Sequence, residues 1–189
     1  PDIVVLGYYL SKTNKLFWAD NDPGDITRDL LDSTLHNSSY TTMGDTLMNR
    51  SNQVNLNVMD PRCREAIAQN VADYQAITAN PLDGVLWDYF DNWIWIAPNV
   101  AEYVSGEPDL DGNVISMYDD AAEQVAYRAA CDSLVLRVDE LLGSDFIQVF
   151  KGRRAHTESA FAALGDGMYY ELFPTQIITD TDMAHALDP

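Results

Sequence analysis

Two acidic side chains follow short apolar runs that have the composition of buried strands. Residues 84–87 are apolar and are followed by Asp88 and then Asp91, and the run 167–170 is followed by Glu171. Parallel strands present their carboxyl ends at one edge of a sheet, so we expect these carboxyl groups to share a site. Two carboxyl groups can divide the tasks of glycoside hydrolysis. We assign Glu171 as the general acid and Asp88 as the nucleophile or base. Asp91 would orient sugar hydroxyls or tune Asp88.

Aromatic and cationic side chains lie near the same strand ends. Aromatic rings suit the apolar faces of a sugar, while carboxylates suit its hydroxyl rim. Alternatives stay open, because strand alternation could turn Trp87 into the core and Trp93 and Trp95 could form a plug under a loop. Lys151 and Arg153 either bind an acidic sugar or offset the local negative charge. The predicted substrate-binding residues are Tyr8, Tyr9, Trp87, Trp93, Trp95, Lys151 and Arg153.

Strand-like and helix-like segments alternate along the chain. Apolar or alternating runs predict strands at residues 3–9, 54–58, 84–87, 146–150 and 167–170. Helical spacing and capping residues predict helices at 60–78 and 121–142, and shorter helices are predicted at 27–36 and 157–164. This alternation predicts an α/β fold with a parallel sheet. A complete eight-stranded barrel takes about 250 residues, so we predict a partial (β/α) barrel of TIM type with about half the strands present. Residues 1–189 would form one such domain.

Five short motifs in this order resemble one group of proteins. They are LGYY (6–9), NVMDPRCREAIAQNV (57–71), DGVLWDYFD (83–91), DLDGN (109–113) and YYELFP (169–174). Together they resemble the glycoside-hydrolase-like TIM-barrel proteins, which are loosely related to the polygalactosaminidase-type enzymes. In that group a strand of the pattern Asp-Gly-apolar-apolar-apolar-Asp and a later strand ending in Glu face one cleft. The resemblance therefore implies a carbohydrate substrate and a site at Asp88 and Glu171.

An acidic stretch in the second half of the chain has part of the spacing of a calcium loop. Asp109, Asp111, Asn113 and Asp120 fall at positions 1, 3, 5 and 12 of an EF-hand-type loop. Val114 stands where such a loop has glycine. The sequence leaves two interpretations, a calcium site and a plain polar turn. Apart from this loop, and from the magnesium site of the third function below, no metal or cofactor is expected.

The net charge of −19 limits the classes of partner that the protein is expected to bind. A chain with so few cations cannot replace the counterions around phosphates, so we expect neither nucleic acid nor an anionic membrane surface as a partner. No apolar run reaches the roughly 18 residues that span a bilayer. The acidity is interpreted as favouring solubility, and it also fits a saline or extracellular setting. Charge alone does not establish the compartment, which is left unknown with an extracellular one favoured. Cys63 and Cys131 are each expected as buried free thiols in helices, with a bridge between the helices as the alternative.

Three functions remain open at this point. The first is a glycoside hydrolase that cleaves a polysaccharide with two carboxyl groups. The second is a non-catalytic carbohydrate-binding or structural module, in which an oligomer or a larger extracellular or particle assembly supplies the missing strands. The third is a magnesium site made of Asp88, Asp91 and Glu171 that hydrolyses a phosphate ester, since acids at strand ends also suit magnesium.

Overall fold

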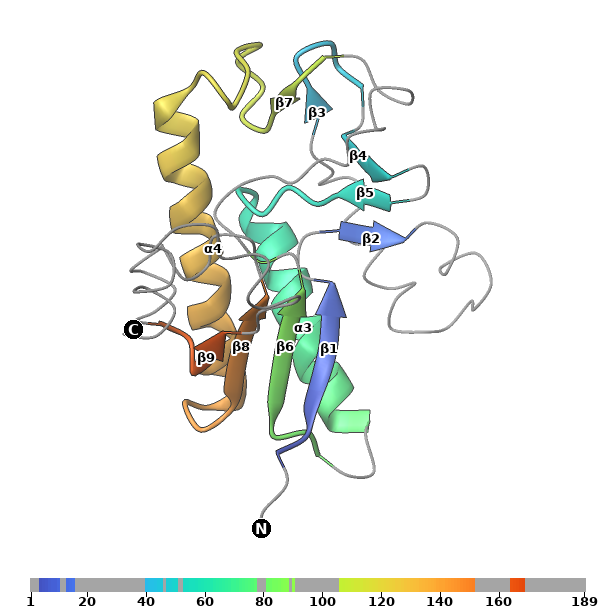
Figure 1. Cartoon of the computed structure of the whole chain (residues 1–189), viewed down its shortest axis with the longest axis vertical. Helices are drawn as coiled ribbons and strands as arrows, with labels where there is room; N and C mark the ends of the chain where they lie inside the picture. Colours follow the sequence, from blue (N-terminus) through green and yellow to red (C-terminus); the bar gives the residue numbers. More distant parts are fainter. Residues whose placement is uncertain are drawn as a thin grey trace, which may run out of the picture.

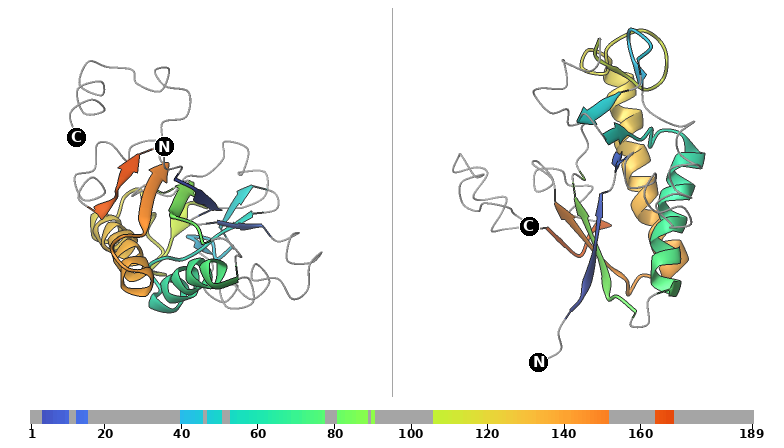
Figure 2. Two further views of the ribbon diagram at one scale, coloured as in Figure 1. Left: turned by 90° about the horizontal axis from the view of Figure 1, so that it is seen from below. Right: turned by 90° about the vertical axis from the view of Figure 1, so that its right-hand side faces the viewer.

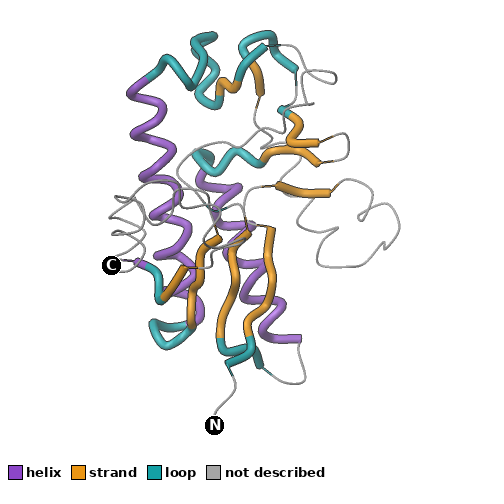
Figure 3. Tube along the Cα trace, in the orientation of Figure 1, coloured by secondary structure: helices purple, strands orange, loops and turns teal. Residues whose placement is uncertain are grey.

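The computed structural model describes residues 4–10, 13–15, 40–45, 47–50, 53–77, 81–88, 90, 106–151 and 164–168 (Figures 1 and 3). The elements in chain order are β1 (Leu6–Leu10), β2 (Thr13–Lys15), β3 (Tyr40–Thr41), β4 (Met48–Arg50), β5 (Gln53–Asn55), α3 (Pro61–Ile77), β6 (Gly84–Asp88), β7 (Pro108–Asp109), α4 (Ala121–Leu142), β8 (Ile147–Lys151) and β9 (Gly167–Met168).

A parallel sheet with strand order β1-β6-β8-β9 forms the centre of the fold. Helices α3 and α4 lie together on one face of this sheet, so the main body has two layers (Figure 2). Two smaller antiparallel sheets, β2-β5-β4 and β3-β7, lie beyond the carboxyl ends of the parallel strands (Figure 1). The small sheets therefore surround the edge at which the sequence placed its candidate site.

The predicted TIM-type barrel is wrong. In the described part of the chain the parallel sheet is open, because β1 pairs only with β6 and β9 pairs only with β8. A barrel requires its edge strands to close on one another. Here the segments between β1 and α3, and between β6 and α4, place their described strands in antiparallel pairs instead of adding parallel strands to the sheet. The parallel α/β arrangement itself is confirmed for the main sheet.

The helices predicted at 60–78 and 121–142 are confirmed as α3 and α4, and each begins at an aspartate. The helices predicted at 27–36 and 157–164 lie outside the described residues, apart from Leu164. Asp60 accepts a hydrogen bond from the backbone N–H of Arg62 at 2.8 Å and precedes Pro61, which suits the first helical position. Asp120 accepts from the backbone N–H groups at the start of α4, and Gly143 ends that helix with a φ of 90°. Among the described residues, neither helix has the length and apolarity to cross a membrane.

The face of the sheet toward the helices carries the core. Val85, Trp87 and Phe150 are buried there with the helix side chains. The polar residue Gln148 lies on this face, and both the oxygen and the nitrogen of its side-chain amide are hydrogen-bonded. It accepts from Trp87 Nε1 at 2.9 Å, and its Nε2 donates to Val135 O at 3.1 Å and Asp139 Oδ1 at 2.6 Å. A buried amide with all these partners links β6, β8 and α4 in one arrangement.

Gly84 of β6 pairs with Ile147 of β8 and has no room for a side chain. A Cβ at this position would overlap the carbonyl oxygen of Ile147 and stand 2.7 Å from the Ile147 Cβ. Gly167 in β9 is a matched contrast, because a Cβ there would meet only Val149 Cγ2 at 3.7 Å, an ordinary contact.

We therefore predict that Gly84→Ala lowers the free energy of unfolding by about 1–3 kcal/mol, since the overlap involves backbone that cannot move aside. Gly167→Ala should leave it unchanged or raise it by up to about 1 kcal/mol, because alanine reduces the entropy of the unfolded chain. Urea unfolding followed by circular dichroism measures both. Equal stability of the two variants would contradict the close approach.

The two cysteines are free and buried, as expected from the sequence. Burial raises the pKa of the Cys63 thiol to about 12. An unfolded thiol ionises near 9.0, so above that pH the unfolded state loses a proton that the folded state keeps. Ionisation of Cys63 therefore destabilises the fold progressively as the pH rises above about 9.

We predict that Cys63 in the Cys131→Ala variant reacts with a thiol reagent at pH 8 at least about 100-fold more slowly when folded than in urea, because the thiolate is the reactive form. The rate of colour release from an aromatic disulfide reagent measures this. Rapid labelling of the folded protein would show that the thiol is accessible and ionised.

Candidate functional site

Asp88 ends β6 at the carboxyl edge of the parallel sheet. The register places it beside Leu10 of β1 and Lys151 of β8. Lys151 Nζ lies 3.0 Å from Asp88 Oδ1, and the Tyr8 hydroxyl donates a hydrogen bond to Asp88 Oδ2. Each carboxylate oxygen thus has a donor from a different neighbouring strand. The two donors fix the orientation of the carboxylate.

These three side chains differ strongly in exposure. Asp88 is 2% exposed, the Lys151 side chain is 20% exposed, and Tyr8 is 60% exposed. A charge this deeply buried is retained when it is paired and hydrogen-bonded, as Asp88 is. A substrate reaches the carboxylate only if a neighbouring side chain moves. Tyr8 is the most exposed member of the group.

Two of the residues predicted to bind substrate lie on the helix-facing side instead. Trp87 is completely buried, and Tyr9 packs edge-on against it with ring centroids 5.4 Å apart. The Tyr9 hydroxyl donates to Asn70 Oδ1 on α3 at 2.7 Å, and burial raises the pKa of Tyr9 well above its usual value. Both rings therefore anchor the strands that carry Tyr8 and Asp88 to the helix layer.

Phe90 completes this support just after β6. Its ring stacks on Phe150 with centroids 5.0 Å apart and lies 5.7 Å from that of Trp87. Its backbone N–H donates to the carbonyl of Lys151 at 3.0 Å. Phe90, two residues after Asp88, is therefore hydrogen-bonded to Lys151, the ion-pair partner of Asp88.

The other predicted site residues lie outside the described residues. They are Asp91, Trp93, Trp95, Arg153 and Glu171. The pairing of Asp88 with Glu171 across one cleft therefore stays a prediction. The magnesium interpretation has less support at Asp88 itself, since the ammonium group of Lys151 already lies against the oxygen that a metal would use.

The acidic loop after β7 folds differently from an EF-hand. A strand and not a helix precedes it, and Asp120 caps α4 through Ala122 N at 2.9 Å and Glu123 N at 3.1 Å. Asn113 Nδ2 donates to Asp120 Oδ2 at 2.8 Å and to Asp111 Oδ2 at 3.1 Å. Asn113 and Asp120 are thus engaged with each other and with the helix. Calcium binding by the predicted set is untested and stays a prediction.

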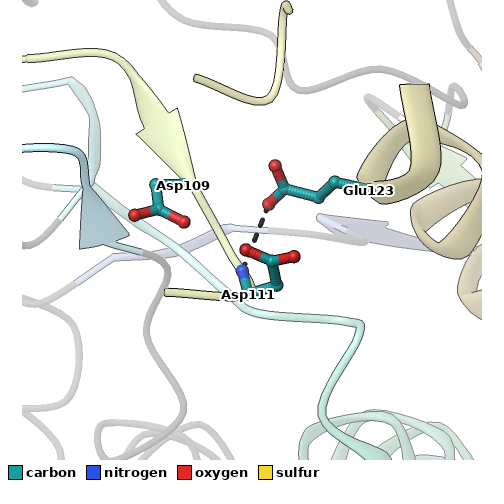
Figure 4. Close-up of side chains that lie close together, drawn as sticks. All are labelled: Asp109, Asp111 and Glu123. Carbon is teal, nitrogen blue, oxygen red and sulfur yellow. Dashed lines mark hydrogen bonds between the residues drawn. The ribbon is translucent and has the colours of Figure 1, made fainter. Parts of the chain in front are cut away.

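Glu123 is the residue of this region that the sequence interpretation missed. Asp120 and Glu123 have the spacing of a capping box, in which the glutamate normally returns to the N-cap. Here Glu123 Oε1 accepts instead from the backbone N–H groups of Leu110 and Asp111. Its carboxyl group joins those of Asp109 and Asp111 in one group (Figure 4). Burial raises the pKa of Glu123.

Comparisons with known proteins give only weak likeness, to solved structures. No protein-family model matches the chain, and no curated protein matches it. Among solved structures, the crystal structure of Aspergillus fumigatus Ega3 in complex with galactosamine matches with a TM-score of 0.37 and 12% sequence identity. The match covers 98% of this chain and 69% of that chain. A likeness this weak does not determine a family, so the proposals below rest on this chain's own residues.

We predict that Lys151→Met lowers the free energy of unfolding by about 3–5 kcal/mol, because it leaves the Asp88 charge buried and without its cation. Adding Asp88→Asn to the same chain should restore a large part of that loss, since it removes the unpaired charge. Urea unfolding of the single and double variants measures the coupling.

Arg137→Met is the matched control. Arg137 pairs with Glu65 at 2.7 Å on the exposed surface of the helices, where an ion pair contributes less than about 1 kcal/mol. If Lys151→Met is no more destabilising than this control, the ion pair at Asp88 is not the buried interaction described above.

Proposed function

We propose that the protein acts on a carbohydrate at the carboxyl edge of its parallel sheet, as a glycoside hydrolase that uses Asp88 and Glu171. The observation that carries the proposal is the Asp88 carboxylate, buried at that edge and held by donors from the strands on either side. A buried charge on a sheet edge contributes little to folding, so a carboxylate held there in a fixed orientation is suited to chemistry.

In this proposal Asp88 is the ionised carboxylate and Glu171 is the proton donor. Asp88 attacks the anomeric carbon or activates a water, while Glu171 protonates the leaving oxygen. Lys151 and Tyr8 would keep the attacking oxygen in place and would bind the negative charge of Asp88 between turnovers. A retaining enzyme would hold the two carboxyl groups roughly 5–5.5 Å apart, and an inverting enzyme about 6.5–9.5 Å apart.

The charge of the chain bears on which glycans it accepts. With a net charge of −19 and a pI near 4.1, the protein repels polyanionic glycans and attracts amine-bearing, cationic ones, while neutral glycans are neither attracted nor repelled by the charge. Lys151 is paired with Asp88, which supports a role in neutralising that carboxylate over a role in binding an acidic sugar. The motif resemblance to the polygalactosaminidase-type enzymes makes galactosamine-containing polymers the first substrates to test.

A second candidate is carbohydrate binding without hydrolysis. The low exposure of Asp88 favours it, because a carboxylate covered by its own partners is a better structural group than a nucleophile. In that case Tyr8, which is 60% exposed, would contact the sugar ring and Asp88 would only orient the Tyr8 hydroxyl. The protein would then be a binding module of a larger extracellular or particle assembly.

We predict that Asp88→Asn and Glu171→Gln each lower kcat for glycan hydrolysis by about 100- to 10,000-fold, since each removes one of the two acid–base functions. Release of reducing ends from a panel of neutral and amino-sugar polymers measures the rate. Melting curves of each variant separate loss of chemistry from loss of fold.

Asp145→Asn is the charge-matched control, because Asp145 is exposed and precedes β8 at the opposite edge of the sheet. It should retain the full rate. Hydrolysis that survives in both the Asp88 and Glu171 variants would remove the mechanism. Glycan binding by the wild type with no product would instead support the binding module.

A further inference from the structure

The carboxyl group of Glu123 has an unusual environment. Glu123 is 2% exposed, and its Oε1 accepts from the backbone N–H groups of Leu110 and Asp111, the latter at 3.2 Å. Among the residues that the structure describes, its buried Oε2 has no hydrogen-bond partner. Buried polar atoms are nearly always paired, and an unpaired carboxylate oxygen is among the most costly exceptions. Glu123 therefore has a buried carboxylate oxygen with the capacity to bind a ligand.

Two further carboxylates lie beside it. One oxygen from each of Asp109, Asp111 and Glu123 lies within 4.8 Å of the other two. Figure 4 shows the Glu123 side chain reaching from α4 toward Asp109 in β7 and Asp111 in the loop that follows. Within the part of the chain that the structure describes, none of the three takes part in an ion pair. Three negative charges this close repel one another unless a cation lies between them.

We propose that Asp109, Asp111 and Glu123 bind a calcium ion. Calcium takes only oxygen ligands at about 2.3–2.6 Å, so two ligand atoms on opposite sides of the ion are about 4.8 Å apart. The three oxygens all lie within 4.8 Å of one another, which is compatible with that span. Magnesium demands a near-ideal octahedron and is usually bound by one or two carboxylates and several waters, so a site with three protein carboxylates favours calcium.

Backbone donors already hold both aspartates in place. Asp109 Oδ1 accepts from Gly112 N at 2.8 Å, and its Oδ2 accepts from Val114 N at 2.9 Å. Asp111 Oδ1 accepts from Asn113 N at 3.0 Å. Each carboxylate oxygen has more than one acceptor position, so these hydrogen bonds leave room for a metal. The ligands would be oriented before the ion arrives.

The bound ion would join three parts of the fold. Asp109 is in β7, Asp111 is in the loop that follows, and Glu123 is in the first turn of α4. Asn57 Nδ2, just before α3, donates to Leu110 O at 2.9 Å, so the same loop contacts the start of both helices. Calcium would thus stabilise the region of small sheets beyond the carboxyl edge of the parallel sheet. This inference does not depend on the proposed carbohydrate function.

Calcium titration of the full chain tests the site. The metal-free protein, prepared with a chelator that is then removed, is titrated with calcium chloride in a calorimeter and melted with and without calcium. We expect one ion per chain, and a Tm higher by roughly 5–10 °C at calcium concentrations about 100-fold above Kd. Glu123→Gln and Asp111→Asn should each weaken binding by at least about tenfold, since each removes a ligand charge.

Two variants complete the test. Asp119→Asn removes the same charge from an exposed residue next to the loop and should bind calcium as the wild type does. If Glu123→Gln does not fold, Asp111→Asn still decides the matter, because Asp111 is exposed and its replacement leaves the core intact. No calcium binding at millimolar concentration, equal loss in Asp119→Asn, or tighter binding of magnesium than of calcium would each overturn the proposal.

Discussion

The register between β6 and β8 is the constraint on which the rest of this structure depends. Gly84 faces Ile147 at one end of the pair, and Asp88 faces Lys151 at the other. The first pairing requires glycine because the strands leave no room for a side chain. The second brings a carboxylate and an ammonium group to the same level of the sheet. A shift of one residue would exchange the faces of β6, placing Trp87 on the outer face and Asp88 among the helix side chains. The shifted register would therefore be costly, because it would bury the Asp88 charge among apolar side chains and remove Trp87 from the core.

The two faces of β6 have separate tasks. On the helix side, the rings of Trp87, Phe90 and Phe150 form a continuous aromatic cluster, and Gln148 links Trp87 to α4. Packing and hydrogen bonding there fix the height and rotation of the strand. On the outer side, the same strand presents the carboxylate between its two donors. The position of the Asp88 carboxylate is therefore fixed by the core packing of Trp87, the residue before it in β6.

Much of the secondary structure could be predicted from the sequence. Asp60 and Asp120 begin the two helices because their carboxylates accept hydrogen bonds from backbone N–H groups of the first turn, and Gly143 ends α4 because glycine adopts a positive φ. The small antiparallel sheets that replace the expected barrel strands could not be predicted. Strands of two residues such as β3 and β7 carry no periodicity, and they pair with each other across a long stretch of sequence. The sequence predicts that both Tyr8 and Tyr9 bind substrate. Side chains alternate along a strand, so the two tyrosines of β1 lie on opposite faces of the sheet and only one of them can lie on the face of Asp88. Glu123 was missed because its capping-box spacing predicts a bond to the helix start, whereas tertiary contacts draw it to the loop.

A crystal structure of the protein with a bound amino-sugar oligosaccharide would test the central claim most directly. The account predicts the sugar at the carboxyl edge of the parallel sheet, against Tyr8, with the Asp88 and Glu171 carboxyl groups on either side of one glycosidic bond and roughly 5–9.5 Å apart. A sugar bound elsewhere, or Glu171 on the far side of the sheet from Asp88, would contradict it.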